Sequence, residues 1–180
     1  MGTKRYAMAI DTKKCVGCNA CVIACKSENQ VPLHYFRDWV EEELTGEYPH
    51  LSMEIRSQRC NQCSKPACVS VCPTGASRVS EGGIVLVDKR KCIGCKACMT
   101  ACPYDARFVH PKGYVDKCTF CVHRVKASLL PACVGICPTS SLIFGDINDA
   151  GSDISKTLRS RKYKVNRPDT GCKPNLYFLV

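Results

Sequence analysis

Residues 92–103 read CIGCKACMTACP, so four cysteines stand at intervals of three, three and four residues and a proline follows the last. Residues 15–25, CVGCNACVIAC, repeat this spacing without the proline. Two more widely spaced sets also end in Cys-Pro: Cys60, Cys63, Cys68 and Cys72, and Cys118, Cys121, Cys133 and Cys137. We number these groups one to four in chain order, and of the 17 cysteines only Cys172 stands outside them.

Groups one and three have the C-x2-C-x2-C-x3-C spacing of iron–sulfur sites in bacterial two-cluster ferredoxins, where the fourth cysteine ligates the other cluster. Three closely spaced cysteines wrap a loop around one face of a cluster, and the fourth lies about one helical turn further on. Gly17 and Ala20, and Gly94 and Ala97, are small enough to let the backbone approach the cluster and donate N–H bonds to sulfur. The spacing therefore predicts clusters held by cysteine thiolates.

Other cysteine chemistries fit this pattern less well. Disulfides need an oxidising compartment and usually an even number of cysteines, whereas this chain has 17. Structural zinc uses two C-x2-C pairs for each ion, which leaves the third cysteine of groups one and three unused. Redox-active dithiols would call for a thioredoxin-like pattern, which the chain lacks.

The exchange of a fourth cysteine between clusters requires the groups to pair. Only residues 73–91 separate groups two and three, so these form one unit, and groups one and four must then pair around it. The predicted ligand sets are Cys15, Cys18, Cys21 with Cys137; Cys118, Cys121, Cys133 with Cys25; Cys60, Cys63, Cys68 with Cys102; and Cys92, Cys95, Cys98 with Cys72.

Short strands and helices are expected around the groups. Residues 6–11 alternate in polarity and predict a strand, as do residues 51–55 before group two and residues 84–87, which follow a Gly-Gly turn. Residues 107–109 and 142–144 predict strands after groups three and four. Proline disfavours helix in the residue before it, so each Cys-Pro ends a short helix, whereas the helix of group one continues toward Asn29.

These elements predict an α+β fold of two interleaved bacterial two-cluster ferredoxin-like units with a pseudo-twofold relation. Residues 1–30 plus 113–146 form the outer unit, and residues 56–112 form the inner unit. Residues 31–55 are an acidic insertion with a net charge of 1 − 6 = −5. Residues 147–180 are a basic C-terminal tail, predicted to contain a short helix and a strand that ends the chain.

The chain carries a formal charge of +10. Four cysteine-ligated clusters bring about −8 in their oxidised forms, so the holoprotein is nearly neutral, and much of the lysine and arginine balances its own cofactors. A basic tail is usually a solvated face, and we expect it to bind a catalytic subunit or anionic headgroups rather than nucleic acid. The sequence is sparse in Leu, Ile, Val and Phe, so the clusters are expected to complete the core, and the apoprotein is not expected to fold stably.

No targeting or membrane segment is expected. The N-terminal residues do not have the pattern of a signal peptide. The longest uncharged stretch, residues 127–145, contains Pro131, Pro138 and Gly135 and is not expected to span a membrane.

Four ferredoxin-type groups, the last reading C-x2-C-x11-C-x3-C-P, resemble the iron–sulfur subunits of the molybdopterin (DMSO reductase) oxidoreductase family from Tyr6 to Asp146. The most specific motifs are Cys15-Val16-Gly17-Cys18, Cys72-Pro73-Thr74-Gly75-Ala76, Cys102-Pro103-Tyr104-Asp105-Ala106-Arg107, and Asp116-Lys117-Cys118-Thr119-Phe120-Cys121 with Arg124. Within the family the chain is most similar to the polysulfide and thiosulfate reductase subunits, because the stretch between groups three and four is short.

The resemblance implies an electron-transfer subunit with four [4Fe–4S] clusters and no catalytic site of its own. Its implied partners are a catalytic subunit with molybdenum or tungsten bis-pterin and a quinone-reactive membrane anchor. The implied location is peripheral to the cytoplasmic membrane, on its periplasmic face, with the cytoplasmic face as the alternative. A freestanding soluble polyferredoxin is the alternative function.

Several residues near the groups have two interpretations. Lys26, Lys96 and Lys117 lie beside cysteines in sequence and either raise cluster potentials or are solvated, the latter being the more ordinary role. The four histidines are interpreted as surface or hydrogen-bonded residues rather than ligands, and Cys172 as a free thiol. Tyr35, Phe36 and Trp39 are expected to pack in the core rather than dock a partner.

Overall fold

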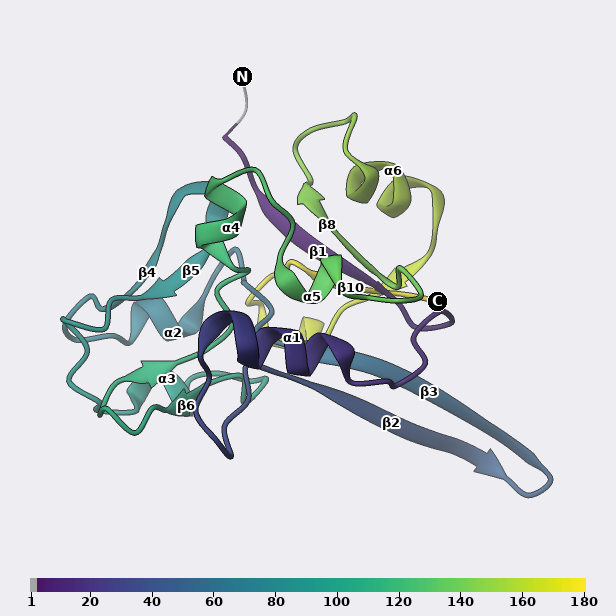
Figure 1. The fold of residues 1–180 in the computed structure, drawn as a ribbon, viewed down its shortest axis with the longest axis horizontal. Coiled ribbons are helices and arrows are strands. Elements are labelled where there is room, and N and C mark those ends of the chain that lie inside the picture. Colours follow the sequence, from purple (N-terminus) through teal and green to yellow (C-terminus); the bar gives the residue numbers. More distant parts are fainter. Residues whose placement is uncertain (1–2) are drawn as a thin grey trace.

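The computed structural model describes residues 3–180, in which short helices and strands are arranged around a small sheet (Figure 1). The sheet has four strands in the order β8 (Leu142–Asp146), β1 (Tyr6–Asp11), β10 (Leu176–Leu179) and β9 (Tyr163–Lys164). Strand β1 runs antiparallel to β8 and parallel to β10. Covered by both neighbours, residues 7–10 of β1 are completely buried.

The C-terminal segment belongs to this sheet, although the sequence suggested a peripheral tail. Leu176 and Leu179 of β10 are fully buried, as is Ile154 of helix α6 (Asp153–Ser160), which packs against the same sheet. Burial of these side chains stabilises the segment at about 1.5–3 kcal/mol for each large apolar residue. The predicted helix and strand are both present, but packing of the strand against β1 makes the segment part of the body.

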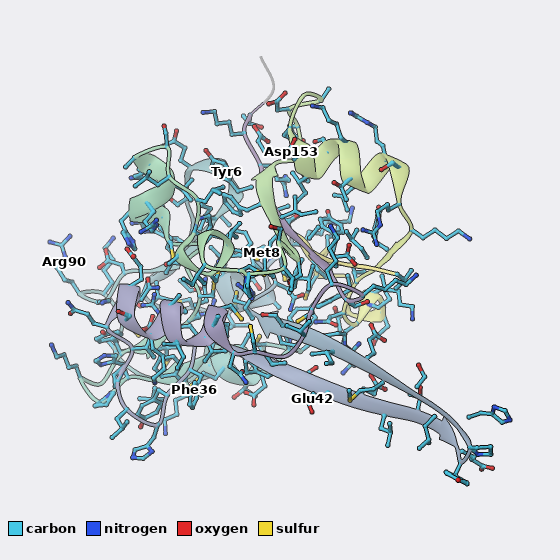
Figure 2. The ribbon with its side chains drawn as sticks, turned by 45° about the vertical axis from the view of Figure 1, so that its right-hand side comes forward. Tyr6, Met8, Phe36, Glu42, Arg90 and Asp153 are labelled. Carbon is cyan, nitrogen blue, oxygen red and sulfur yellow. The ribbon has the colours of Figure 1, made fainter. Side chains whose placement is uncertain are left out.

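A long hairpin extends from the body (Figure 1). It consists of β2 (Asp38–Glu47) and β3 (His50–Arg59), so the strand predicted over residues 51–55 is longer than expected and has a partner. At the base of the hairpin Asp38 and Arg59 are buried, whereas the outer half is solvent-exposed and its side chains point away from the body (Figure 2).

Each cysteine group contributes one short helix. Helices α2 (Ala67–Ser70), α3 (Ala97–Thr100) and α5 (Ala132–Gly135) are single turns that end just before a Cys-Pro pair. Helix α1 (Ala20–Asn29) has ten residues and runs past Cys25, where no proline follows. These boundaries confirm the helix ends predicted from the prolines. Helix α4 (Val122–Lys126) lies in the long spacer of group four.

Two small hairpins complete the chain. Strands β4 (Ser77–Val79) and β5 (Val85–Val87) pair across the 3-10 turn Glu81–Gly83, and β6 (Phe108–Val109) pairs with β7 (Val115–Asp116). The larger core cluster mixes apolar side chains such as Met8, Ile10 and Phe178 with Cys60, Cys118 and Cys133. Among residues 3–180, no helix has the length and apolar character needed to cross a bilayer.

We predict that Arg161→Gln destabilises the docked C-terminal segment in a pH-dependent way. Arg161 donates to both carboxylate oxygens of buried Asp11, and this hydrogen bonding lowers the pKa of that carboxyl. A carboxyl with a lowered pKa stabilises the fold above its unfolded value of about 3.9 and loses that contribution as the pH falls through the folded value. The variant should therefore be less stable by about 1 kcal/mol at neutral pH, and its difference from the parent should shrink only as the pH falls below about 4 toward the folded value.

The measurement is the urea midpoint of the iron-loaded protein under anaerobic conditions between pH 3 and pH 8. Acid damage that affects both proteins equally cancels when the urea midpoint of the variant is subtracted from that of the parent. Arg159→Gln is the matched control, because Arg159 donates to the Ala150 carbonyl and so has no titrating partner. A constant difference between parent and R161Q across this pH range would contradict the prediction.

Candidate iron–sulfur sites

Four cavities in the body are each lined by four cysteines of the four groups, and sulfur atoms gather within the body (Figure 2). In every cavity three cysteines come from one group and the fourth from another. They are site one (Cys15, Cys18, Cys21, Cys137), site two (Cys60, Cys63, Cys68, Cys102), site three (Cys92, Cys95, Cys98, Cys72) and site four (Cys118, Cys121, Cys133, Cys25). The structure thus brings together the same sets that the sequence predicts, and binding of a cluster by each set stays a prediction.

Left-handed backbone turns wrap the loops of groups one and three. Gly17 and Gly94 have φ values of 67° and 69°, and Asn19 and Lys96, two residues later in each group, have values of 58° and 64°. A Cβ atom at Gly94 would lie 2.5 Å from the carbonyl oxygen of Gly113, which is too close. Glycine at this position therefore lets the loop close onto the neighbouring segment while its cysteines face the cavity.

Hydrogen-bond donors are directed at several of the cysteine sulfurs. Backbone N–H groups of Ser77 and Val115 donate to Cys72 Sγ at 3.3 Å and to Cys92 Sγ at 3.4 Å. Although burial opposes it, donors from Ser141 and Thr139 lower the pKa of Cys137 to about 7. These donors stabilise a thiolate, which is the form that binds iron, and they are among the factors that set a cluster's potential.

Other cysteines are buried strongly enough to hold their protons. Burial, together with the adjacent Cys60, raises the pKa of both Cys63 and Cys118 to about 12. A metal ligand must be deprotonated, so these thiols become thiolates only where a positive charge compensates them. Sixteen converging thiols, several of which need such a charge, fit iron–sulfur clusters, and the same thiols would hold them.

The described side chains do not form a site for a single metal ion. Within residues 3–180, no three Cys, His, Asp or Glu side chains converge closely enough to hold a single metal ion. In a [4Fe–4S] cluster, by contrast, each thiolate binds a different iron at one corner of a cube.

Three buried cations lie between these sites. The sequence motifs did not identify these three residues as a set. Arg59 donates to Cys133 Sγ at 2.9 Å, and Arg107 donates to Cys68 Sγ at 2.7 Å. Lys117 donates to the carbonyl oxygens of Cys118, at 2.7 Å, and Val85. Their exposed fractions are 1%, 4% and 1%. The interpretation of Lys117 as a solvated lysine is therefore wrong, because its ammonium lies among carbonyl oxygens in the interior.

The other two lysines lie elsewhere. Lys26 donates to the carbonyl oxygens of Pro32 and Tyr35 and lies 4.4 Å from the centre of the Phe36 ring, so it fastens the loop after α1. Lys96 is exposed and precedes helix α3, as the solvated interpretation expects.

The remaining side chains flagged by sequence have ordinary surroundings, with one exception. His110 stacks on Tyr114, His123 bonds to Glu28, and His34 and His50 are exposed. Tyr35 stacks on Phe108 and Trp39 packs against the core, whereas Phe36 is half exposed. The exception is Cys172, which is buried in the wall of site two, a position that no sequence signal indicated.

Comparison with known proteins agrees with this geometry. Two models described as "4Fe-4S dicluster domain" match residues 51–147 and 14–76. The chain therefore belongs to the family of 4Fe–4S dicluster proteins.

Individual relatives are similar over nearly the whole chain. The chain is 44% identical to a tetrathionate reductase subunit of Salmonella typhimurium, covering 97% of this chain and 72% of the relative. It is 43% identical to the NrfC homologue of Haemophilus influenzae, covering 98% and 80%. It is 44% identical to a polysulfide reductase chain of Wolinella succinogenes, covering 98% and 94%. These matches confirm the resemblance to iron–sulfur subunits of the polysulfide reductase type.

We predict that Cys25 and Cys118 serve the same cluster although 93 residue positions separate them. Cys25→Ser should lose one cluster, about four irons. The double variant with Cys118→Ser should lose no more than that. The double variant of Cys25→Ser with Cys15→Ser should lose two clusters, about eight irons.

Iron and sulfide analysis of anaerobically purified protein distinguishes these results, and Cys172→Ser is the control for loss of a thiol outside the groups. The crossed assignment would be overturned if the iron losses of Cys25→Ser and Cys118→Ser add in their double variant, while those of Cys25→Ser and Cys15→Ser do not.

Proposed function

We propose that the chain is the electron-transfer subunit of a respiratory oxidoreductase complex and that each of its four cysteine sites holds a [4Fe–4S] cluster. The single observation that carries this proposal is the set of four cavities, each lined by three cysteines of one group and a fourth from another group. When bound, such clusters supply one-electron transfer. The chain's own residues hold the clusters, donate hydrogen bonds to sulfur and exclude water.

The four sites form a row. Arg59 and Ser57 connect sites four and one, Lys117 connects sites four and two, and Arg107 connects sites two and three. The order is therefore one, four, two, three. The two end sites each carry an exposed cysteine, Cys18 and Cys95, whereas every cysteine of site four is buried. This arrangement supports entry and exit of electrons at opposite ends.

The same row supports two interleaved ferredoxin-like units. Residues 1–30 with 113–146 would hold sites one and four, and residues 56–112 would hold sites two and three. Strand β1, which precedes group one, pairs with β8, which follows group four, and this pairing closes the outer unit. One arginine donates to the third cysteine of a group in each unit, Arg59 to Cys133 and Arg107 to Cys68, but both arginines come from residues 56–112, and the pseudo-twofold relation stays a prediction.

The hairpin favours a subunit of a complex over a freestanding polyferredoxin. Leu44 and Met53 are a cross-strand pair on one of its faces, with exposed fractions of 65% and 59%. Toward the body the same face meets the group-one loop, because Gly17 lies close to Glu42 and Ile55. An apolar face beside an exposed end site is suited to a protein partner that exchanges electrons there.

Because the chain is related to proteins named as parts of tetrathionate and polysulfide reductases, we propose partners of two kinds. One is a catalytic subunit with molybdenum or tungsten bis-pterin, and the other is a quinone-reactive membrane anchor. The complex would act in polysulfide- or thiosulfate-type respiration. The chain would lie peripherally at the cytoplasmic membrane, on the periplasmic face.

The proposal predicts that the tagged chain, purified from detergent-solubilised membranes of its natural host, is brown and contains about 16 irons. It should co-purify with a large subunit that contains molybdenum or tungsten and releases a fluorescent pterin on oxidation. An iron-loaded chain that remains alone in both membrane and soluble fractions would instead support the freestanding carrier. A colourless zinc protein would exclude both functions.

We further predict that the double variant Leu44→Ser with Met53→Ser binds the catalytic subunit about tenfold more weakly, or worse. Binding of the parent would bury two apolar side chains away from water, and the variant lacks this gain. Iron content should not change, since both residues lie outside the body. The matched control is Thr45→Ala with Ser52→Ala, the next cross-strand pair, on the opposite face of the hairpin. Equal recovery of the pterin subunit with parent, variant and control would show that this face does not bind it.

A further inference from the structure

Arg59 connects two neighbouring cysteine sites. One guanidinium nitrogen, Nη1, donates to Cys133 Sγ of site four at 2.9 Å, and the other, Nη2, donates to Ser57 Oγ. Ser57 lines site one, and its hydroxyl lies 3.5 Å from Cys21 Sγ. Because the serine oxygen accepts from the arginine, its proton is free to point to the sulfur. A single buried cation thus reaches the ligand thiols of two sites.

Arg107 repeats this arrangement at the other end of the row. Its Nη2 donates to Cys68 Sγ of site two at 2.7 Å and to Ser77 Oγ at 3.1 Å. Ser77 lines site three, and its backbone N–H donates to Cys72 Sγ of that site at 3.3 Å. An arginine, a serine and one thiol from each of two sites therefore occur together twice in the molecule.

Lys117 lies at the remaining junction, between sites four and two. Its ammonium donates to the carbonyl oxygen of Cys118, a site-four cysteine, and to that of Val85, which lines site two. Along the order one, four, two, three, each junction therefore has one buried cation. Although 26 Lys and Arg residues are present, these three have almost no exposed surface.

Such burial is costly unless anionic groups compensate the charge. Isolated buried cations are strongly disfavoured, and within residues 3–180 the charged group of Arg59 alone among the three is at ion-pair distance from a carboxylate, 3.8 Å from Asp38. The charge of Arg107 faces the Cys68 thiol and a serine hydroxyl, and its buried Nη1 has no hydrogen-bond partner within residues 3–180. Thiolates and sulfides of bound clusters are the anions that would balance it.

We propose that Arg59, Lys117 and Arg107 are positioning charges, one for each junction, and that each raises the reduction potentials of the two clusters beside it. A fixed cation stabilises the added electron on either side, and it weakens the repulsion between two reduced neighbours. This proposal rests on the ligand sets proposed above. It assigns to three residues of this chain the task of keeping the four potentials close enough for electrons to pass along the row.

The test is a potentiometric titration of the iron-loaded full chain, followed by electron paramagnetic resonance, for the parent and for Arg59→Gln and Arg107→Gln. Removal of a buried unit charge near a redox group changes its energy enough for about a tenfold shift in the oxidised-to-reduced ratio. Tenfold corresponds to 59 mV for a one-electron couple. R59Q should lower two of the four potentials, R107Q should lower the other two, and the double variant should lower all four.

Charge-conserving and surface controls separate a charge effect from a structural one. Arg59→Lys and Arg107→Lys keep the cation and should leave all four potentials near those of the parent. Arg90→Gln removes a cation whose side chain is 94% exposed and points into solvent (Figure 2), and it should shift none. Ser57→Ala removes only the hydroxyl beside Cys21 and should lower a single potential, one of the pair that R59Q lowers.

Unshifted potentials in fully loaded R59Q and R107Q would overturn the proposal, as would a shift of the same pair in both or equal shifts in the lysine variants. If the glutamine variants lose iron, retention of iron and of all four potentials by the lysine variants supports the charge role. If the lysine variants also lose iron, the S57A variant becomes the test. Four unchanged reduction potentials in S57A would then overturn the proposal. An error in the ligand sets would be visible separately, as iron well below about 16 in the parent chain.

Discussion

A thiolate can be buried only beside a positive charge or a set of hydrogen-bond donors, and this requirement governs the interior of the molecule. Sixteen cysteines converge on four cavities, and burial raises the pKa of several of them, such as Cys63 and Cys118. The chain meets the requirement locally with backbone N–H groups, as at Cys72, and between sites with Arg59, Lys117 and Arg107. A bound cluster would supply the rest of the positive charge through its iron.

The same requirement explains why so little regular structure suffices. Helices α2, α3 and α5 are single turns, and the strands outside the large hairpin are short. Each cavity joins cysteines from two groups, so segments distant in sequence meet at the sites rather than through extended sheets. The sheet of β8, β1, β10 and β9 holds the two ends of the chain together, and the Arg161–Asp11 ion pair fastens the C-terminal segment to β1. Binding of clusters and folding of the chain are therefore expected to be coupled.

Function follows from the positions of the sites rather than from any single reactive group. Exposed cysteines lie at the two ends of the row, and the most buried site lies inside it. The hairpin extends the surface at one end and presents apolar side chains beside the group-one loop. This division between a shielded interior and two accessible ends suits a chain that passes electrons between partners. A freely diffusing carrier has no evident use for the hairpin.

The sequence by itself determined which three cysteines of a group face one cavity and where the short helices end, because loop wrapping and the effect of proline depend on neighbours in the chain. The fourth cysteine of each cavity followed from the order of the groups, which leaves one way to pair them. It also indicated the family, through motifs such as Cys102-Pro103-Tyr104-Asp105-Ala106-Arg107. Only the tertiary structure decided that β10 lies beside β1, that Lys117 is buried, and that Arg59 reaches Cys133, 74 positions away. These contacts join segments far apart in sequence, and they depend on packing in three dimensions, which local spacing does not encode.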